Sequence, residues 1–195
     1  MYVKKESEYQ NNPVIKTVIE VLTSGATIAA ADFDTNAVKE LKAGSIVGKD
    51  SNGLFHFLKT AKVHANVAID ATVVQVKKGH TFKVGEVVVD TALALKADKI
   101  TAIDTSNADY DSLTIEAAIG ALSAGAIIVK AAAEAATAGT GVFAYTPIGL
   151  TINSVDLTLD NQHTGVLVRG TVNETNMPQY VDANIKASLP LIRFE

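Results

Sequence analysis

The residue types that could carry out chemistry are few in this chain and lie far apart. The four histidines, His56, His64, His80 and His163, are scattered along the sequence. None of them stands at the i, i+4 helical spacing or close to the carboxylate pair that metal sites usually have. We therefore expect surface or loop histidines, no metal site, no cofactor and no catalytic residue. The prediction is that the protein is not an enzyme.

Two short segments have the composition of ligand-binding loops. Residues 43–50 resemble the phosphate loop of nucleotide-binding proteins, but Asp50 stands where that loop has the Ser or Thr that holds magnesium, and residues 51–53 predict a hairpin turn. Residues 104–111 offer oxygen ligands for calcium, but they lack the central glycine and terminal glutamate of a helix-loop-helix site. We interpret the first segment as a chance match and the second as a solvated turn.

Length, charge and cysteine content argue against several classes of protein. The chain has 195 residues, a formal net charge of −4 and no cysteine, so it is long enough to bury a core and forms no disulfide. Its basic residues are dispersed, which disfavours binding to a phosphate backbone. The most apolar stretch, residues 117–129, is shorter than the roughly 20 residues of a membrane span, and the polar start is typical of neither a signal peptide nor an anchor. We expect a soluble protein with no nucleic-acid and no membrane partner.

Any site in this chain must be positioned mainly by β-strands. From Pro13 onward the sequence is dense in Val, Ile and Thr, whose branched side chains favour strands over helices. Segments of strand length are separated by Gly, Asn and Asp. We expect strands in residues 14–22, 67–76, 99–104, 112–116, 164–172 and 191–194.

One local pattern occurs four times, with a glycine just before an apolar run. The glycines are Gly25, Gly44, Gly85 and Gly125. Each pattern predicts a tight turn in which glycine supplies a positive φ, followed by a strand. Irregular spacing between the copies favours shared turn chemistry over duplication. Small barrels and sandwiches are built in this way.

Helical signals are short. Asp34 or Thr35 is a candidate cap for a turn that reaches Leu41, and the Ala-rich residues 130–137 predict a second short helix. The clearest pattern starts at Pro178, repeats apolar residues every four positions through residues 181–189, and is ended by Pro190. It predicts a short amphipathic helix packed on the sheet.

The middle of the chain has strand and turn signals of its own. Residues 62–139 contain several of the predicted strands and the acidic turn, and they predict a small inserted β-barrel. The flanking residues 14–61 and 140–195 would then pair with each other into one outer domain.

Both flanks carry motifs that resemble a known family. The C-terminal flank contains the residues 144–158 (AYTPIGLTINSVDLT), 165–174 (GVLVRGTVNE) and 185–194 (IKASLPLIRF), and the N-terminal flank contains 42–48 (KAGSIVG) followed by Asn52 and Gly53. These motifs resemble the head decoration and head-fibre proteins of tailed bacteriophages. In that family a strand ending in glycine and Leu or Ile, a "VD" turn, a "VLV" strand, a short helix and a terminal "LP" strand follow in this order.

The resemblance implies a mainly β, decoration-protein-like fold with short helices and an inserted small barrel-like segment. The middle segment has no counterpart in the smallest decoration proteins, which favours the head-fibre subgroup. Residues 1–13 would be an N-terminal arm that binds the capsid, with Tyr2, Tyr9 and Pro13 as its contact residues. The fold-defining residues of the motif are Gly44, Gly149, Asp156, Gly170, Val172, Pro190, Ile192 and Phe194.

The function that the resemblance implies is structural. The chain would be a virion protein on the outer capsid surface, or would be encoded by a prophage in a bacterial genome. Its partners would be two further copies of itself in a homotrimer and the major capsid protein. The alternative is a phage-borne or cell-surface adhesin or carbohydrate-binding module, in which the inserted segment contacts host surface glycans. An enzyme on a β scaffold is the third hypothesis, and it would need clustered acids or histidines in a cleft.

Overall fold

Strands make up most of the regular structure in residues 13–34 and 38–195, which are the residues that the computed structural model describes. The mainly β fold with few short helices confirms the prediction from Val, Ile and Thr density. The strands are β1 (Ile15–Val21), β2 (Ala26–Ile28), β3 (Glu40–Leu41), β4 (Ile46–Lys49), β5 (Phe55–Phe57), β6 (Thr60–Lys62), β7 (Val73–Lys77), β8 (Val87–Asp90), β9 (Asp98–Asp104), β10 (Tyr110–Ile115), β11 (Ile127–Lys130), β12 (Pro147–Thr151), β13 (Val155–Asp156), β14 (Gln162–Thr164), β15 (Val166–Val172) and β16 (Ile192–Phe194). The helices are the 3₁₀ turns η1 (Ala30–Asp32) and η2 (Glu174–Asn176) and the α-helix α1 (Ala183–Ala187).

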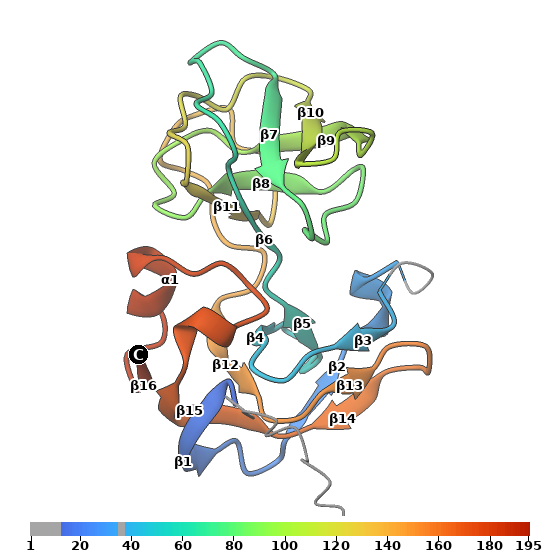
Figure 1. The fold of residues 1–195 in the computed structure, drawn as a ribbon, viewed down its shortest axis with the longest axis vertical. Coiled ribbons are helices and arrows are strands. Elements are labelled where there is room, and N and C mark those ends of the chain that lie inside the picture. The colour runs from blue at the N-terminus through green and yellow to red at the C-terminus, as the bar shows by residue number, and fades with distance from the viewer. Residues whose placement is uncertain (1–12, 35–37) are drawn as a thin grey trace, which may run out of the picture.

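The larger sheet has eight strands and forms the lower part of the molecule in Figure 1. Its order is β1-β15-β12-β4-β5-β2-β14, and β16 also pairs with β15. Most neighbours are antiparallel, while β2 with β5 and β15 with β16 are parallel. The sheet therefore joins strands from both ends of the chain, and β13 and β3 form a small two-stranded sheet beside it.

The smaller sheet has six strands and forms the upper part in Figure 1. Its order is β6-β11-β8-β9-β10-β7. A bridge between Val63 and Val76, and a hydrogen bond of 2.8 Å from the His64 amide to the Gln75 carbonyl, bring β7 back to the end of β6. The sheet thereby curls into the small barrel-like body that the sequence predicted. We call this part the barrel and the lower part the outer sheet.

One of the hydrophobic clusters is shared by the two parts. The barrel has an interior of its own, which includes Ile100 and Leu113. A second cluster, however, combines Val89 and Val129 of the barrel with Leu167 of the outer sheet. Burial of apolar area across this junction stabilises both parts at once.

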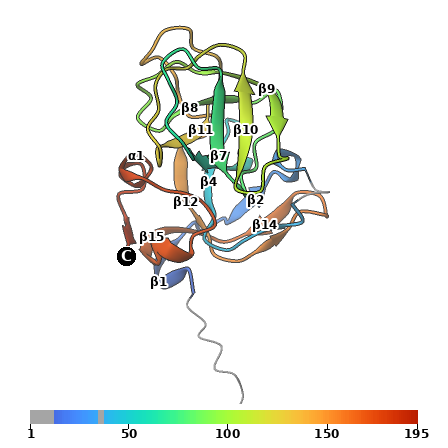
Figure 2. The same cartoon turned by 45° about the horizontal axis from the view of Figure 1, so that its top comes forward.

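The C-terminal segment from β15 to β16 lies against both parts (Figures 1 and 2). The Asp182 carboxylate caps α1 by accepting from the amides of Asn184 (3.1 Å) and Ile185 (3.0 Å). It also accepts a hydrogen bond from the Thr91 hydroxyl, just after β8 of the barrel. Ile185 is fully buried in the shared core. The short helix therefore fastens the barrel to the outer sheet.

This helix is shorter than its sequence pattern indicated. It begins at Ala183 and not at Pro178. The reason is Gln179, whose buried amide accepts from the Ile46 amide at 2.5 Å and donates to the Leu58 carbonyl at 2.5 Å. Because the Gln179 side chain is held by the backbone of Ile46 and of Leu58, the residues around it do not continue the helix toward its N-terminus.

The predicted glycine turns are confirmed. Gly25, Gly44, Gly85 and Gly125 have φ values of 62°, 82°, 91° and 89°. The strands β2, β4, β8 and β11 follow them within two residues. Positive φ is the conformation that glycine adopts at little cost, so these turns explain why the same pattern recurs in both sheets.

Two local predictions were wrong. Residues 130–137 form no helix, because their amides pair with other segments: Ala131 donates to Val87 and Ala135 to Ala97. The strand expected over 67–76 begins only at Val73. In both cases the folded arrangement overrides local propensity. The turn expected to begin at residue 34 or 35 would run through residues 35–37, which lie outside the described residues; at its two ends the Val38 amide donates to the Asp34 carbonyl at 2.8 Å.

The close contact between the paired strands β1 and β15 generates a stability prediction for Gly170. A Cβ atom on this residue would collide with the Thr17 carbonyl oxygen of β1 and lie 3.0 Å from Leu167 Cδ1. Gly170→Ala is therefore expected to lower the free energy of unfolding by about 1–3 kcal/mol in urea titrations.

Gly165→Ala is the matched control, because the added Cβ would meet only the end of the Ile152 side chain, at 3.2 Å. We expect a smaller loss of stability. Equal losses for the two variants would contradict the role of the close contact between β1 and β15.

Candidate functional site

The residues expected to bind the capsid lie at the start of the chain. Pro13 is exposed and stands two residues before β1. Tyr2 and Tyr9 lie outside the described residues. The structure therefore describes only the point at which this arm joins the outer sheet.

Most of the motif residues come together inside the outer sheet. Gly149 in β12 and Gly170 in β15 allow close contact between strands, because a Cβ on either would collide with a neighbouring backbone carbonyl. Val172 and Ile192 are buried in the shared core, and Phe194 packs against it. These residues define the fold and do not form a surface site.

The remaining motif residues lie elsewhere. Gly44 turns into β4 with a positive φ, and its Cα faces Val14 closely enough to exclude a Cβ. Asp156 lies in β13, where it accepts hydrogen bonds from the Thr158 hydroxyl (2.6 Å) and amide (2.8 Å). These hydrogen bonds lower the pKa of Asp156. Pro190 is exposed after α1, so all three residues have roles in local turns.

The first strand is a candidate interaction surface, because its apolar side chains are exposed. β1 is at the edge of the outer sheet, where it pairs only with β15 among the described strands (Figure 1). Its exposed apolar side chains are Val18 (50%), Ile19 (61%) and Val21 (41%). An edge strand with apolar residues exposed on both faces is unusual in a protein that remains a monomer.

The register of β1 limits how a partner can bind to it. Its pairing with β15 is interrupted by shifts between Ile15 and Thr17, between Val18 and Glu20, and again before Val21. Bulges of this kind twist an edge strand and disfavour the addition of another strand. Contact with a partner would therefore use the side chains of β1 more than its backbone.

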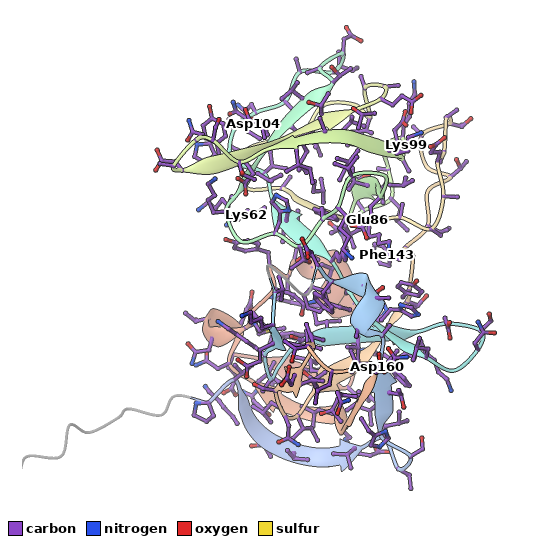
Figure 3. All side chains as sticks on the ribbon, turned by 90° about the vertical axis from the view of Figure 1, so that its right-hand side faces the viewer. Lys62, Glu86, Lys99, Asp104, Phe143 and Asp160 are labelled. Carbon is purple, nitrogen blue, oxygen red and sulfur yellow. The ribbon has the colours of Figure 1, made fainter. Side chains whose placement is uncertain are left out.

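A buried ion pair lies at the junction of the two parts. The side chain of Lys59, between β5 and β6, has no exposed area, and its Nζ atom lies 2.6 Å from Glu86 Oε1. Lys130 at the end of β11 contacts the same oxygen at 3.0 Å, and the Lys83 amide donates to Glu86 Oε2 at 2.9 Å. Figure 3 shows Glu86 at the level where the barrel meets the outer sheet.

The ionisation of this pair follows from burial and mutual attraction. Burial lowers the pKa of Lys59, while the hydrogen bond and charge of Glu86 oppose that change. Burial alone would raise the pKa of Glu86, but the Lys59 hydrogen bond and charge, the Lys83 amide and Lys130 together bring it below its ordinary value. Glu86 is thus held as a carboxylate with cationic partners.

His56 corrects the expectation that the histidines are surface or loop residues. It is buried in β5, with Nδ1 3.0 Å from Asp32 Oδ2 and Nε2 3.5 Å from Asp50 Oδ2. Its ring stacks on Tyr145 at a centroid distance of 3.9 Å. The sequence spacing concealed this carboxylate pair because Asp32 comes from η1 and Asp50 from the β4–β5 turn.

His80 lies in a loop, between β7 and β8, as expected, but its side chain is buried. Its side chain is 6% exposed and Nε2 lies 3.3 Å from the buried carboxylate of Asp111. The Phe82 amide donates to Nδ1 at 3.2 Å, so Nδ1 is the acceptor and Nε2 carries the proton. Burial is the main cause that lowers the pKa of His80, which favours this neutral form.

The segments with ligand-like composition form turns. Residues 51–53 make the β4–β5 hairpin turn, where the Asp50 carboxylate accepts from the Asn52 and Leu54 amides at 2.9 and 2.8 Å. Residues 104–111 connect β9 to β10. Among the residues that the structure describes, an acidic group that could hold a metal lies elsewhere, at Asp98, Glu116 and Glu134. Lys99 Nζ lies 2.7 Å from Glu116 and 3.6 Å from Glu134, so a lysine already compensates this charge.

Comparison with known proteins gives no relatives for this arrangement. No protein-family model, no curated protein and no solved structure matches the chain. None of the helices formed by residues 13–34 and 38–195 has the length and apolar character needed to cross a membrane.

The sequence reasoning missed the junction residues, since their partners are remote in the chain. Lys59 and Glu86 are 27 positions apart, and neither spacing nor motif connects them. One signal was available: Lys59 lies in a mostly apolar run, residues 54–61, whose other polar residues are His56 and Thr60. A lysine inside such a run requires a buried counter-charge.

Glu86→Gln tests how much the buried ion pair contributes to the free energy of unfolding. The substitution leaves buried Lys59 without its negative partner, so we expect the free energy of unfolding at neutral pH to fall by about 3–5 kcal/mol. Glu134→Gln is the control, because that side chain is 56% exposed; the expected change is at most about 0.5 kcal/mol.

The pH dependence of the stability difference between the wild type and Glu86→Gln tests whether the charge of Glu86 causes it. Because the folded pKa of Glu86 is below its ordinary value of 4.5, its stabilisation is present above that pH and is lost as pH falls through the folded pKa. Urea titrations should therefore show the wild type and Glu86→Gln converging in acid. A constant difference down to low pH would contradict the ion-pair explanation.

Proposed function

We propose that this protein is a structural subunit that assembles as a homotrimer and binds the outer surface of a tailed-bacteriophage head, as a decoration or head-fibre protein. The observation that carries the proposal is β1, an edge strand whose apolar side chains are exposed directly after the N-terminal arm. The motif resemblance of both flanks supports the same assignment.

Exposed apolar area on β1 is suited to contact between copies of the chain. Burying Val18, Ile19 and Val21 removes these side chains from water, which favours association by roughly 25 cal/mol for each Å² of apolar area. In a ring of three copies, β1 of one subunit contacts a different surface of the next, and the rotation closes the assembly.

A closed trimer of this kind would carry three N-terminal arms, and each arm could contact the capsid. Residue 13 lies two residues before β1, so each arm would start beside a subunit contact. Three weak capsid contacts then combine through effective concentration, because binding of one arm holds the other two near their sites. Function would rest on apolar burial and repeated contact, without a chemical step.

Ile19→Asp tests the subunit contact. The variant is expected to fold with unchanged secondary structure, because this side chain is largely exposed, but to sediment as a monomer, since a carboxylate would be buried in the contact without a partner. Light scattering of the purified chain gives the mass, with three times 20.4 kDa expected for the wild type.

Ile69→Asp is the matched control. Ile69 is 67% exposed but lies on the barrel, before β7. The Ile69→Asp variant should therefore remain a trimer. A wild-type monomer, or a trimer that survives Ile19→Asp, would contradict the assigned contact.

The role of the arm is tested by deletion of residues 1–13. The shortened chain should remain a folded trimer, because these residues precede every strand of the described structure, while its occupancy on phage heads should fall. Quantification of the bound protein on purified particles measures this directly. Full occupancy without the arm would show that another surface binds the capsid.

A further inference from the structure

A pocket of about 220 Å³ lies where the barrel meets the outer sheet. Thr60 of β6 and Thr81 of the β7–β8 loop line it, and Phe33 and Phe57 line it as well. Pockets for drug-sized ligands have about 300–1,000 Å³. This pocket is smaller, so it has room for one ring-sized group.

Two hydroxyl groups in the wall lack partners. The Oγ1 atoms of Thr60 and Thr81 are buried and have no hydrogen-bond partner within residues 13–34 and 38–195. Thr60 as a whole is 6% exposed. A buried hydroxyl without a partner costs about 1–3 kcal/mol, so a ligand that bonds to it recovers that loss. Each threonine hydroxyl can both donate and accept a hydrogen bond, so it can bond to a hydroxyl group of a ligand.

The rest of the lining combines aromatic rings with a few polar groups, among them Ser45 and Gln179. Phe33 and Phe57 pack together with their ring centroids 5.1 Å apart, and the 38% exposed ring of Tyr180 lines the pocket as well. Tyr180 follows Gln179, whose amide is fixed by the backbone of β4 and of Leu58. Aromatic faces next to hydroxyl groups suit a ligand with apolar C–H groups on one side and hydroxyl groups on the other.

Charge argues against an ionic ligand. Glu40 and Lys42 are the charged residues among the described lining residues, they have opposite sign, and both are exposed. An anion or cation in the pocket would therefore lose water without a buried counter-charge.

We propose that this pocket binds one neutral pyranose unit of a carbohydrate, with Thr60 and Thr81 bonding to its hydroxyl groups and the aromatic wall covering its C–H face. The binding site differs from the predicted glycan contact, because aromatic residues of the outer sheet supply part of it. It is independent of the proposed capsid function, since an isolated chain that never forms a trimer would still bind the sugar.

The test is a titration of the full-length chain with the methyl glycosides of glucose, galactose and mannose, followed by amide resonances in two-dimensional NMR. We expect at least one glycoside to shift the amides of Thr60, Thr81 and Tyr180 with a Kd on the order of 1 mM. Thr81→Val removes the hydroxyl and keeps the shape, so the affinity should fall about tenfold while the thermal midpoint is unchanged or higher.

Thr164→Val is the matched control, because Thr164 Oγ1 is likewise buried without a partner among the described residues but lies in β14, outside the lining of this pocket. Its sugar affinity should equal that of the wild type. Tyr180→Ala, at a partly exposed position, provides a second variant that should weaken binding. The proposal is overturned if no glycoside shifts the pocket amides, or if Thr81→Val binds as well as the wild type.

Discussion

The junction between the barrel and the outer sheet is the constraint on which the rest of this structure depends. The chain enters the barrel after β5 and returns to the outer sheet before β12, so only two connections cross at this level (Figures 1 and 3). Two connections alone would leave the parts free to move. The shared core and the Lys59–Glu86 pair prevent this, because separation would expose apolar side chains and leave a lysine buried without its carboxylate.

The C-terminal segment acts on the same junction from outside. Asp182 caps α1 and receives the Thr91 hydroxyl, while Gln179 holds the backbone of β4 and of Leu58. The last strand then returns to β15, parallel to it. A single segment thus connects the barrel, the edge region and the centre of the outer sheet, and it also contributes Tyr180 to the wall of the pocket.

The two proposed activities use different surfaces. β1 lies at the far edge of the outer sheet (Figure 1), whereas the pocket lies against the barrel. A subunit contact through Ile19 would therefore leave the pocket wall formed by Thr60 and Thr81 unaffected. Because the two surfaces are separate, a substitution can remove either proposed activity without removing the other.

The sequence by itself determined the local features whose cause is local. Branched residues predicted the strands, and Gly25, Gly44, Gly85 and Gly125 predicted the turns, because conformational preference acts within a few residues. Tertiary structure alone decided the rest: His56 between two carboxylates, the burial of Lys59, and the unpartnered hydroxyl groups in the pocket. These depend on residues that are remote in sequence, and the Ala-rich segment after β11 shows the same effect, since pairing with Ala97 overrides its helix propensity. Burial and charge partnership are properties of the folded arrangement, and no spacing along the chain encodes them.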